Sequence, residues 1–198
     1  LDMFSWNGIS EASLQQGCSG FGKMRHSDHR LSPKFTFSED FSSGLVPKFN
    51  SNGEVAPESL PLISSGKLTN TLVSSRTAEE YGAQTNYAEN GEELRSPHMS
   101  PGDLRTEDIL NKLDEGLYLS NIHYLNWSDN PGGRITGLTR YACFWVEQGQ
   151  IVAPIETMRF DDTFYRFFGS ELESVGSSAE VIPDVLTYGQ RNLGAITC

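Results

Sequence analysis

Histidine and cysteine are the residues of this chain best suited to metal binding or nucleophilic chemistry, so their spacing decides what reactions it could support. Zinc hydrolases place two histidines on one face of a helix, with a neighbouring glutamate that activates water. The chain has four histidines, none followed by glutamate: His26, His29, His98 and His123. His26 and His29 enclose Asp28 in RHSDHR, so a hydrolase using these three residues is one open hypothesis. A polar surface turn is the interpretation we favour for this segment.

The remaining candidates form no catalytic pattern. His98 lies in a segment with two prolines and is expected to be solvated, whereas His123 lies on a predicted strand beside aromatic residues and is expected to be a packing residue. Cys18, Cys143 and Cys198 are widely spaced and form no CxxC pair, so they predict neither a disulfide framework nor a structural zinc site. Cys143 lies between bulky apolar residues and is expected to be an inert buried thiol.

Acidic residues occur in four adjacent pairs, and no nucleophile elbow or phosphate-binding loop accompanies them. Neighbouring residues on a strand point to opposite faces, so two adjacent acids there would not face the same site. Charged residues are also mostly exposed, and we therefore expect these pairs to be solvated. We therefore assign no catalytic residue, no metal ligand and no cofactor to the chain itself. The pairs are Glu39-Asp40, Glu79-Glu80, Glu92-Glu93 and Asp161-Asp162.

Composition excludes several classes of protein. The chain has 198 residues, 26 of them acidic and 15 basic, and a net charge of −11. Such a surface repels phosphates, so direct binding to nucleic acid is not expected. No segment approaches the roughly 18 apolar residues that a membrane span requires, and no signal peptide is recognisable. The odd cysteine count fits a reducing compartment, so we expect a cytoplasmic protein. The first residue, Leu1, indicates a piece of a larger protein.

Local patterns predict short elements separated by glycine-rich turns. Ser10 and Thr106 are expected to cap helices, and Gly82 is expected to close one. The pairs Ser65-Gly66 and Gln148-Gly149 are expected to be the turns of two hairpins, since glycine tolerates the positive φ of such turns. The predicted helices cover residues 10–16, 75–81, 106–115 and 161–168. The predicted strands cover residues 34–38, 59–64, 67–74, 117–125, 141–147, 150–154, 181–187 and 194–198.

Hairpins without regular βαβ alternation predict an α+β fold that is β-rich, with antiparallel sheets, sandwich-like or half-barrel-like, and about four short helices. We expect eight or nine strands in one domain over residues 1–198. Sub-lobes 1–95 and 96–198, sharing one core, are possible divisions, because the polar segment 86–101 is predicted to be a loop.

Aromatic residues are concentrated between residues 160 and 168. Phe160, Phe164, Tyr165, Phe167 and Phe168 are five aromatics within nine residues, more than one short helix buries on one face. Core packing is expected for most of them. Packing of the others against another domain or a second protomer is the open alternative.

Four segments, in order, resemble the C-terminal domain of the TldD/PmbA family, known as modulators of DNA gyrase. GISEASLQQGCSGFGK (8–23) is similar to the family's S-G-x-x-V-x-x-G-R-S entry. LPLISSGKL (60–68) with SSRTAEEYG (74–82) resembles its strand–turn–strand leading into a helix. The run 96–122 resembles its P-G-D, acidic helix and E-G-L strand, and ITGLTRYACFWVEQGQIVAPIETMRF (135–160) resembles its G-F-W-V-E-N-G-E-I pattern.

This resemblance implies a two-lobed protein that forms a dimer with an active-site cleft between domains. One subunit type is a zinc metallopeptidase with HExxxH in the N-terminal half and a distant cysteine ligand, and it acts on unfolded peptides. The PmbA or TldE type lacks that motif, and this chain resembles it more closely. HExxxH is absent here, residues 183–194 contain no cysteine, and Cys198 lies too late to be assigned as the ligand.

Two departures from the family pattern shape the functional expectation. Asn50-Ser51-Asn52-Gly53-Glu54 stands where the family has Asp-Asp-Glu-Gly, and Cys143 replaces a small glycine. We therefore expect the non-catalytic or partner-subunit portion of a TldD/PmbA-type metallopeptidase system, with peptides as substrates and a homo- or heterodimeric assembly. Zinc belongs to the catalytic members in this view. A metal-independent peptide-binding or scaffold module, with proteolysis lost, is the alternative.

Overall fold

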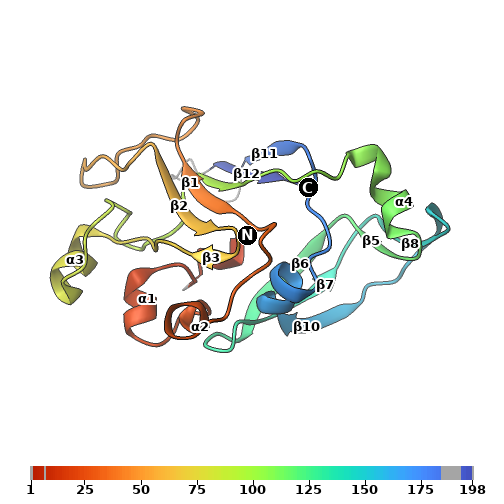
Figure 1. The fold of residues 1–198 in the computed structure, drawn as a ribbon, viewed down its shortest axis with the longest axis horizontal. Helices are drawn as coiled ribbons and strands as arrows, with labels where there is room; N and C mark the ends of the chain where they lie inside the picture. Colours follow the sequence, from red (N-terminus) through yellow and green to blue (C-terminus); the bar gives the residue numbers. More distant parts are fainter. Residues whose placement is uncertain (1, 7, 184–192, 198) are drawn as a thin grey trace.

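A computed structural model of the protein describes residues 2–6, 8–183 and 193–197. Three β-sheets and four short α-helices make up this part of the chain (Figure 1). The predicted α+β, β-rich class with antiparallel sheets is therefore confirmed. The longest of these helices spans seven residues, and none in the described ranges combines the length and the hydropathy that crossing a bilayer requires.

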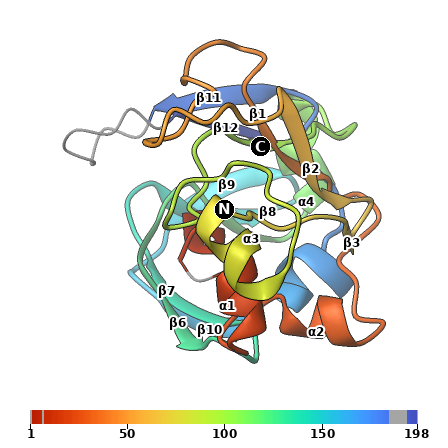
Figure 2. The same cartoon turned by 90° about the vertical axis from the view of Figure 1, so that its left-hand side faces the viewer.

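The largest sheet has six strands in the order β11-β12-β4-β1-β2-β3. Its neighbouring strands pair antiparallel, except that β12 and β4 run parallel. Figure 2 views this end of the molecule with α3 in front and β11 along the top. Strands from both ends of the chain thus complete one sheet. The strands are β1 (Phe37–Asp40), β2 (Ser59–Ser64), β3 (Lys67–Leu68), β4 (Pro97–Met99), β11 (Ala179–Pro183) and β12 (Leu193–Thr197).

Side-chain caps and glycine turns place the helices and hairpins as the sequence predicts. The hydroxyl of Ser10 accepts a hydrogen bond from the Ser13 N–H at the start of α1 (Glu11–Gln15). Ser74 caps α3 (Ser75–Tyr81) in the same way, and Gly82 closes that helix with φ 68°. The turn between β2 and β3 has positive φ at both Ser65 and Gly66, as predicted for this hairpin. Helix α2 (Gly22–His26) lies against β3.

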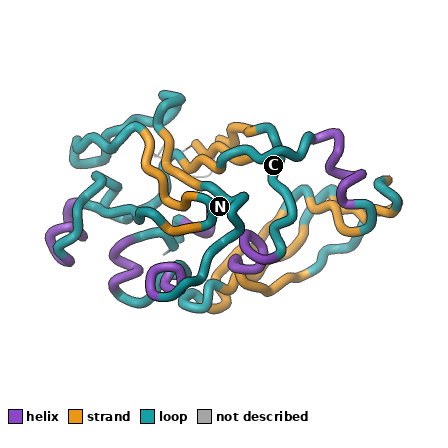
Figure 3. Tube along the Cα trace, viewed as in Figure 1, coloured by secondary structure: helices purple, strands orange, loops and turns teal. Residues whose placement is uncertain are grey.

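The other six strands form two three-stranded sheets, and each strand of one sheet is joined directly to a strand of the other. Strands β5 (Gly116–Leu119), β8 (Cys143–Glu147) and β9 (Gln150–Pro154) form one sheet. Each is joined directly to a strand of the next sheet, which consists of β6 (Ile122–Asp129), β7 (Arg134–Thr139) and β10 (Arg159–Thr163). Three short connections join the two sheets: residues 120–121, 140–142 and 155–158, which can be followed in Figure 3. We call these three connections together the meander break.

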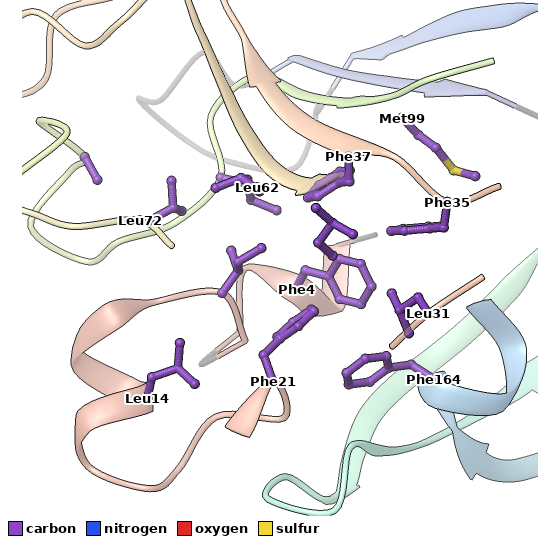
Figure 4. Close-up of a cluster of buried hydrophobic side chains, with 14 of the residues drawn as sticks. Phe4, Leu14, Phe21, Leu31, Phe35, Phe37, Leu62, Leu72, Met99 and Phe164 are labelled. Carbon is purple, nitrogen blue, oxygen red and sulfur yellow. The ribbon is translucent and has the colours of Figure 1, made fainter. Parts of the chain in front are cut away.

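Phenylalanine rings from both ends of the chain form the core. Phe4 lies at its centre, edge-on to the rings of Phe21, Phe35, Phe37 and Phe164 (Figure 4). The ring of Phe168 meets Phe4 edge-on as well. Ring centroids in these pairs lie 5.0 to 6.2 Å apart, the range in which edge-to-face pairs are favourable. The core therefore closes only when residues from the beginning and the end of the sequence meet.

The predicted aromatic helix at 161–168 is wrong in part. Residues up to Thr163 belong to β10, which pairs with β7, and the helical segment that follows is a π-helix, η3 (Arg166–Ser170). Phe164 is fully buried between the two elements, whereas Phe167 is 38 % exposed. The aromatic cluster is therefore divided between the core and the surface.

Four further predictions need correction. Residues 117–125 form two strands, because the meander break separates β5 from β6. The predicted loop 86–101 contains β4, which pairs with β1. The expected strand 67–74 ends at Leu68, and β1 lies at 37–40 instead of 34–38.

The segment 106–115 is less helical than predicted. It divides into a 3₁₀ turn, η2 (Thr106–Asp108), and α4 (Ile109–Leu113), and the side chain of Thr106 caps neither. The last predicted strands, 181–187 and 194–198, overlap β11 and β12, although residues 184–192 and 198 lie outside the described residues.

Candidate functional site

The HxxH pair lies on the surface, as predicted. His26 ends α2, and both His26 and His29 are exposed. The Oγ atom of Ser27 lies 2.8 Å from Nδ1 of His29, and the His29 ring lies edge-on to Tyr165 at 5.8 Å. These contacts explain the segment as a polar turn.

The other two histidines lie on strands. His98 is half-buried on β4, opposite Ser38 of β1, so its predicted placement in a solvated loop is wrong. His123 lies on a strand beside an aromatic residue, as predicted: it belongs to β6, and its ring lies 4.3 Å from that of the exposed Tyr124.

The described residues do not fit the zinc site that the family resemblance implies for catalytic members. Within residues 2–6, 8–183 and 193–197, no three side chains of His, Cys, Asp or Glu group closely enough to hold a metal ion. Cys198 and most of residues 183–194 lie outside the described residues. We therefore derive no reaction step through zinc for this part of the protein.

Glu92 is buried, which contradicts the expectation that the acidic pairs are solvated. Its carboxylate accepts hydrogen bonds from Ser10 Oγ (2.6 Å), the Ala12 N–H (3.0 Å) and the Ser74 N–H (2.8 Å). Ser10 and Ser74 are the cap residues of α1 and α3, so one carboxylate stabilises the starts of two helices. This role is structural.

Glu39 is the second buried member of the acidic pairs. Its Oε1 atom accepts the backbone N–H groups of Arg95 (2.6 Å) and Ser96 (2.7 Å). Burial raises the pKa of Glu39, because a low-dielectric environment disfavours the charged form. The guanidinium of Arg95 donates to the carbonyls of Pro47 and Phe49, so this cluster holds the loop between β1 and β2 against the sheet.

Glu11, in the first turn of α1, is a third buried carboxylate. It forms a bidentate ion pair with Arg25, at 3.0 and 2.6 Å, and accepts the hydroxyl of Thr71 at 2.5 Å. The hydrogen bonds from Arg25 lower the pKa of Glu11 to about 2, because they favour the charged form. No sequence signal pairs residues so far apart, so only the fold reveals this contact.

The segment that departs from the family's acidic pattern forms a turn. Asn50 Oδ1 accepts the backbone N–H groups of Asn52 and Glu54, each at 3.0 Å. Ser51 donates to the carboxylate of Glu89 through both its N–H and its hydroxyl. The asparagine side chain thus supplies the local backbone contacts that define the turn.

The sheet formed by β5, β8 and β9 is the best candidate for a binding surface, and we call it the uncovered sheet. Every residue of β9 is exposed, including Ile151 (48 %) and Val152 (56 %). Leu117, Trp145 and Ala153 lie opposite one another across the three strands and so share one apolar face. β9 is an edge strand, so one side of its backbone is not paired within the described sheet.

Acidic residues lie at the two ends of the uncovered sheet. Glu115 precedes β5, Glu147 ends β8 and Glu156 follows β9 in sequence, and all three side chains are exposed. Asp114, whose carbonyl accepts the Gly149 N–H at 2.9 Å, adds a fourth carboxylate beside the β8–β9 turn. We call these four residues the acidic rim. An apolar face within this rim suits a partner that is both apolar and basic.

A comparison with protein-family models matches residues 1–196 to the PmbA/TldA metallopeptidase C-terminal domain. The chain belongs to this family. The resemblance inferred from the sequence is therefore confirmed for almost the whole of this PmbA/TldD-type domain. No curated protein sequence matches it.

Solved structures share the fold of the PmbA/TldD-type domain at low sequence identity. A protein from Thermotoga maritima named as a modulator of a DNA gyrase superposes with TM-score 0.74 at 16 % identity, over 96 % of this chain and 43 % of its own. A similarly named protein from Bacteroides thetaiotaomicron gives TM-score 0.71 at 14 % identity, over 96 % and 41 %.

TldE from Thermococcus kodakarensis shows the same relationship, with TM-score 0.71 at 16 % identity, over 96 % of this chain and 43 % of that one. The chain therefore spans about two fifths of the length of these relatives. At these low sequence identities, the structural similarity shows that this chain shares the fold of the three proteins and nothing beyond the fold.

Proposed function

We propose that this PmbA/TldD-type domain is the non-catalytic or partner-subunit portion of a cytoplasmic metallopeptidase system and that it binds unfolded peptides. The observation that carries the proposal is the uncovered sheet, whose edge strand β9 is exposed along its whole length. The non-catalytic role rests on the sequence, which contains neither HExxxH nor a cysteine in residues 183–194. In this proposal zinc and the cleaving residues belong to a TldD-type subunit with which the chain forms a dimer.

Strand addition explains how an edge such as β9 binds peptides of many sequences. An extended peptide pairs its main chain with the free N–H and C=O groups of an edge strand, and side-chain pockets add selectivity. Pro154 has no N–H, so pairing that needs backbone donors is confined to residues 150–153. Main-chain pairing suits unfolded segments, since a folded partner has already used these groups.

Charge sets the expected preference among peptides. The acidic rim and the net charge of −11 attract basic residues and repel acidic ones. Because the rim carboxylates are exposed, this contribution should weaken as salt rises.

A titration of the chain with a fluorescent, unstructured, basic peptide tests the proposal by anisotropy. Val152→Lys places a charge on β9 and should weaken binding at least tenfold, since lysine on an edge disfavours strand addition. Val181→Lys is the matched control: Val181 is equally exposed, at 54 %, but lies on the edge of the six-stranded sheet. An absence of peptide affinity, or loss of binding only in Val181→Lys, would contradict the proposal.

A metal-independent peptide-binding or scaffold module is the second candidate, and the absence of HExxxH and of this cysteine from the sequence also favours it. Mixing the chain with a catalytic family member and measuring peptide cleavage separates the two. Faster cleavage supports a partner subunit, whereas binding without any change in cleavage supports a scaffold. Stoichiometric zinc in the isolated chain, measured by elemental analysis, would overturn both.

A further inference from the structure

A pocket of about 170 Å³ opens at the meander break. It lies between the β7–β8 connection and the end of β9, and its lining includes Arg140, Cys143, Phe144, Pro154 and Ile155. Its volume is close to that of an engineered cavity of ~150 Å³ that holds a benzene molecule. The pocket therefore has room for one large side chain and not for an extended ligand.

The backbone beside this pocket is strained. Tyr141 and Ala142 adopt φ values of 46° and 38°, which non-glycine residues rarely adopt and which cost about 1 to 3 kcal/mol each. The carbonyl of Tyr141 is held by the Ser120 hydroxyl and by the Cys143 thiol, each at 3.1 Å. Strain of this kind concentrates at ligand-binding sites, where the surrounding structure maintains it.

The same conformation leaves two successive backbone donors available. Within the described part of the chain, the N–H groups of Tyr141 and Ala142 donate to no protein acceptor. Successive N–H groups in a turn form concave sites that bind anions. The adjacent N–H of Arg140 differs, because it donates to the Asn121 carbonyl at 3.0 Å.

Arg140 supplies the positive charge. Its guanidinium lies 4.6 Å from the centre of the Tyr141 ring, and the residue is half-buried. Two other described arginines without a carboxylate within 4.0 Å, Arg30 and Arg76, are exposed to solvent. Arg140 is thus a half-buried arginine whose guanidinium has no carboxylate partner among the described residues, in a chain with 26 acidic residues, so it is available to an anionic ligand.

We propose that this pocket, the break pocket, binds the C-terminal residue of a peptide, with the terminal carboxylate on Arg140 and the adjacent N–H groups. An apolar side chain would pack against Phe144, Pro154 and Ile155. The inference rests on the proposed peptide binding and adds the direction of the peptide. Since Pro154 ends β9 at the pocket, a peptide paired parallel to β9 brings its C-terminus there.

Anisotropy titrations of the full chain with three fluorescent peptides test the assignment. All share an unstructured, weakly basic body: one ends in phenylalanine with a free carboxylate, one in phenylalanine amide, and one is an amide with an internal glutamate. The free acid should bind about tenfold tighter than its amide, as expected for a fork of hydrogen bonds between arginine and a carboxylate. Arg140→Gln should remove this preference, and Arg140→Lys should keep part of it. Arg76→Gln, which changes an exposed arginine of α3, should leave it unchanged.

Equal affinity for acid and amide, or a preference that survives Arg140→Gln, would overturn the inference while the proposed function stands. Tighter binding of the peptide with the internal glutamate would show that the break pocket binds acidic side chains and not the C-terminal carboxylate, which would overturn the inference. No binding of any of the three peptides would remove the proposed function and this inference together. The wild-type comparison of acid with amide decides the matter even if an Arg140 variant fails to fold.

Discussion

The aromatic core and the uncovered sheet use similar residues but bury them very differently. Around Phe4, five further phenylalanine rings close on one another from segments far apart in sequence. On the uncovered sheet, Leu117, Ile151 and Val152 remain exposed although they lie in regular strands. Regular strands thus occur in both regions, whereas burial depends on whether another layer packs against the strand. Five predictions test this contrast, from the largest expected effect to the smallest.

The core should be the most sensitive region. Phe4→Ala removes the central ring and should lower the free energy of unfolding by about 3 to 5 kcal/mol in urea denaturation. Phe49→Ala is the control, because Phe49 is 58 % exposed, and it should cost less than about 1 kcal/mol. Equal effects of the two substitutions would show that the packing around Phe4 is wrong.

The buried carboxylate between α1 and α3 should come next. Glu92→Ala leaves three donors without an acceptor and should lower the free energy of unfolding by about 2 to 4 kcal/mol. Glu93→Ala changes the exposed neighbour and should alter stability by less than about 0.5 kcal/mol. A harmless Glu92→Ala would mean that water replaces the carboxylate.

Acid should weaken the ion pair between Glu11 and Arg25. Because the folded pKa of Glu11, about 2, lies below its unfolded value of 4.5, its contribution is present above pH 4.5 and is lost as pH falls toward 2. Arg25→Gln should lower stability at pH 7 by about 1 to 3 kcal/mol and reduce the dependence on pH in that window. Urea denaturation of both proteins between pH 2 and pH 7 measures this, and parallel pH profiles would count against it.

Relief of strain at the meander break should stabilise the protein. Ala142→Gly keeps the positive φ without a Cβ and should raise the free energy of unfolding by about 0.5 to 1 kcal/mol. Ala153→Gly, in the extended strand β9, should lower it by a similar amount, since glycine there only adds freedom to the unfolded chain. A change of the same sign in the free energy of unfolding of both variants would contradict the strained conformation at Ala142.

The uncovered sheet should tolerate polar substitution. Val152→Ser should change the free energy of unfolding by less than about 0.5 kcal/mol, because the side chain is already exposed. The same variant should weaken the binding of an apolar-sensitive dye, which measures the exposed apolar surface. A large loss of stability would show that this face is covered in solution.

The sequence predicted those features that depend on neighbouring residues. Ser10 and Gly82 mark helix ends through a hydrogen bond and a φ value that are set within one turn. The hairpin at Gln148-Gly149 forms as predicted for the same reason, since both residues have positive φ.

Features that depend on distant residues escaped prediction. Glu92 and Glu39 look like ordinary surface acids until Ser10 and Ser96, far along the chain, supply their donors. The β5–β6 connection at Ser120 and Asn121 contains no glycine, and neither do Tyr141 and Ala142 between β7 and β8, so no glycine in the sequence marks the meander break or the break pocket. The exposed apolar face of the uncovered sheet also escaped prediction, because its exposure depends on which other elements pack against it in the fold.

The central position of Phe4 also governs how the chain must fold during synthesis. The ribosome releases Phe4 and Phe21 long before Phe164, whose ring packs against both. Contacts between such remote positions form slowly, because a long loop must close first. Until then the nascent chain presents aromatic rings to its surroundings, and exposed apolar surface of this kind favours aggregation.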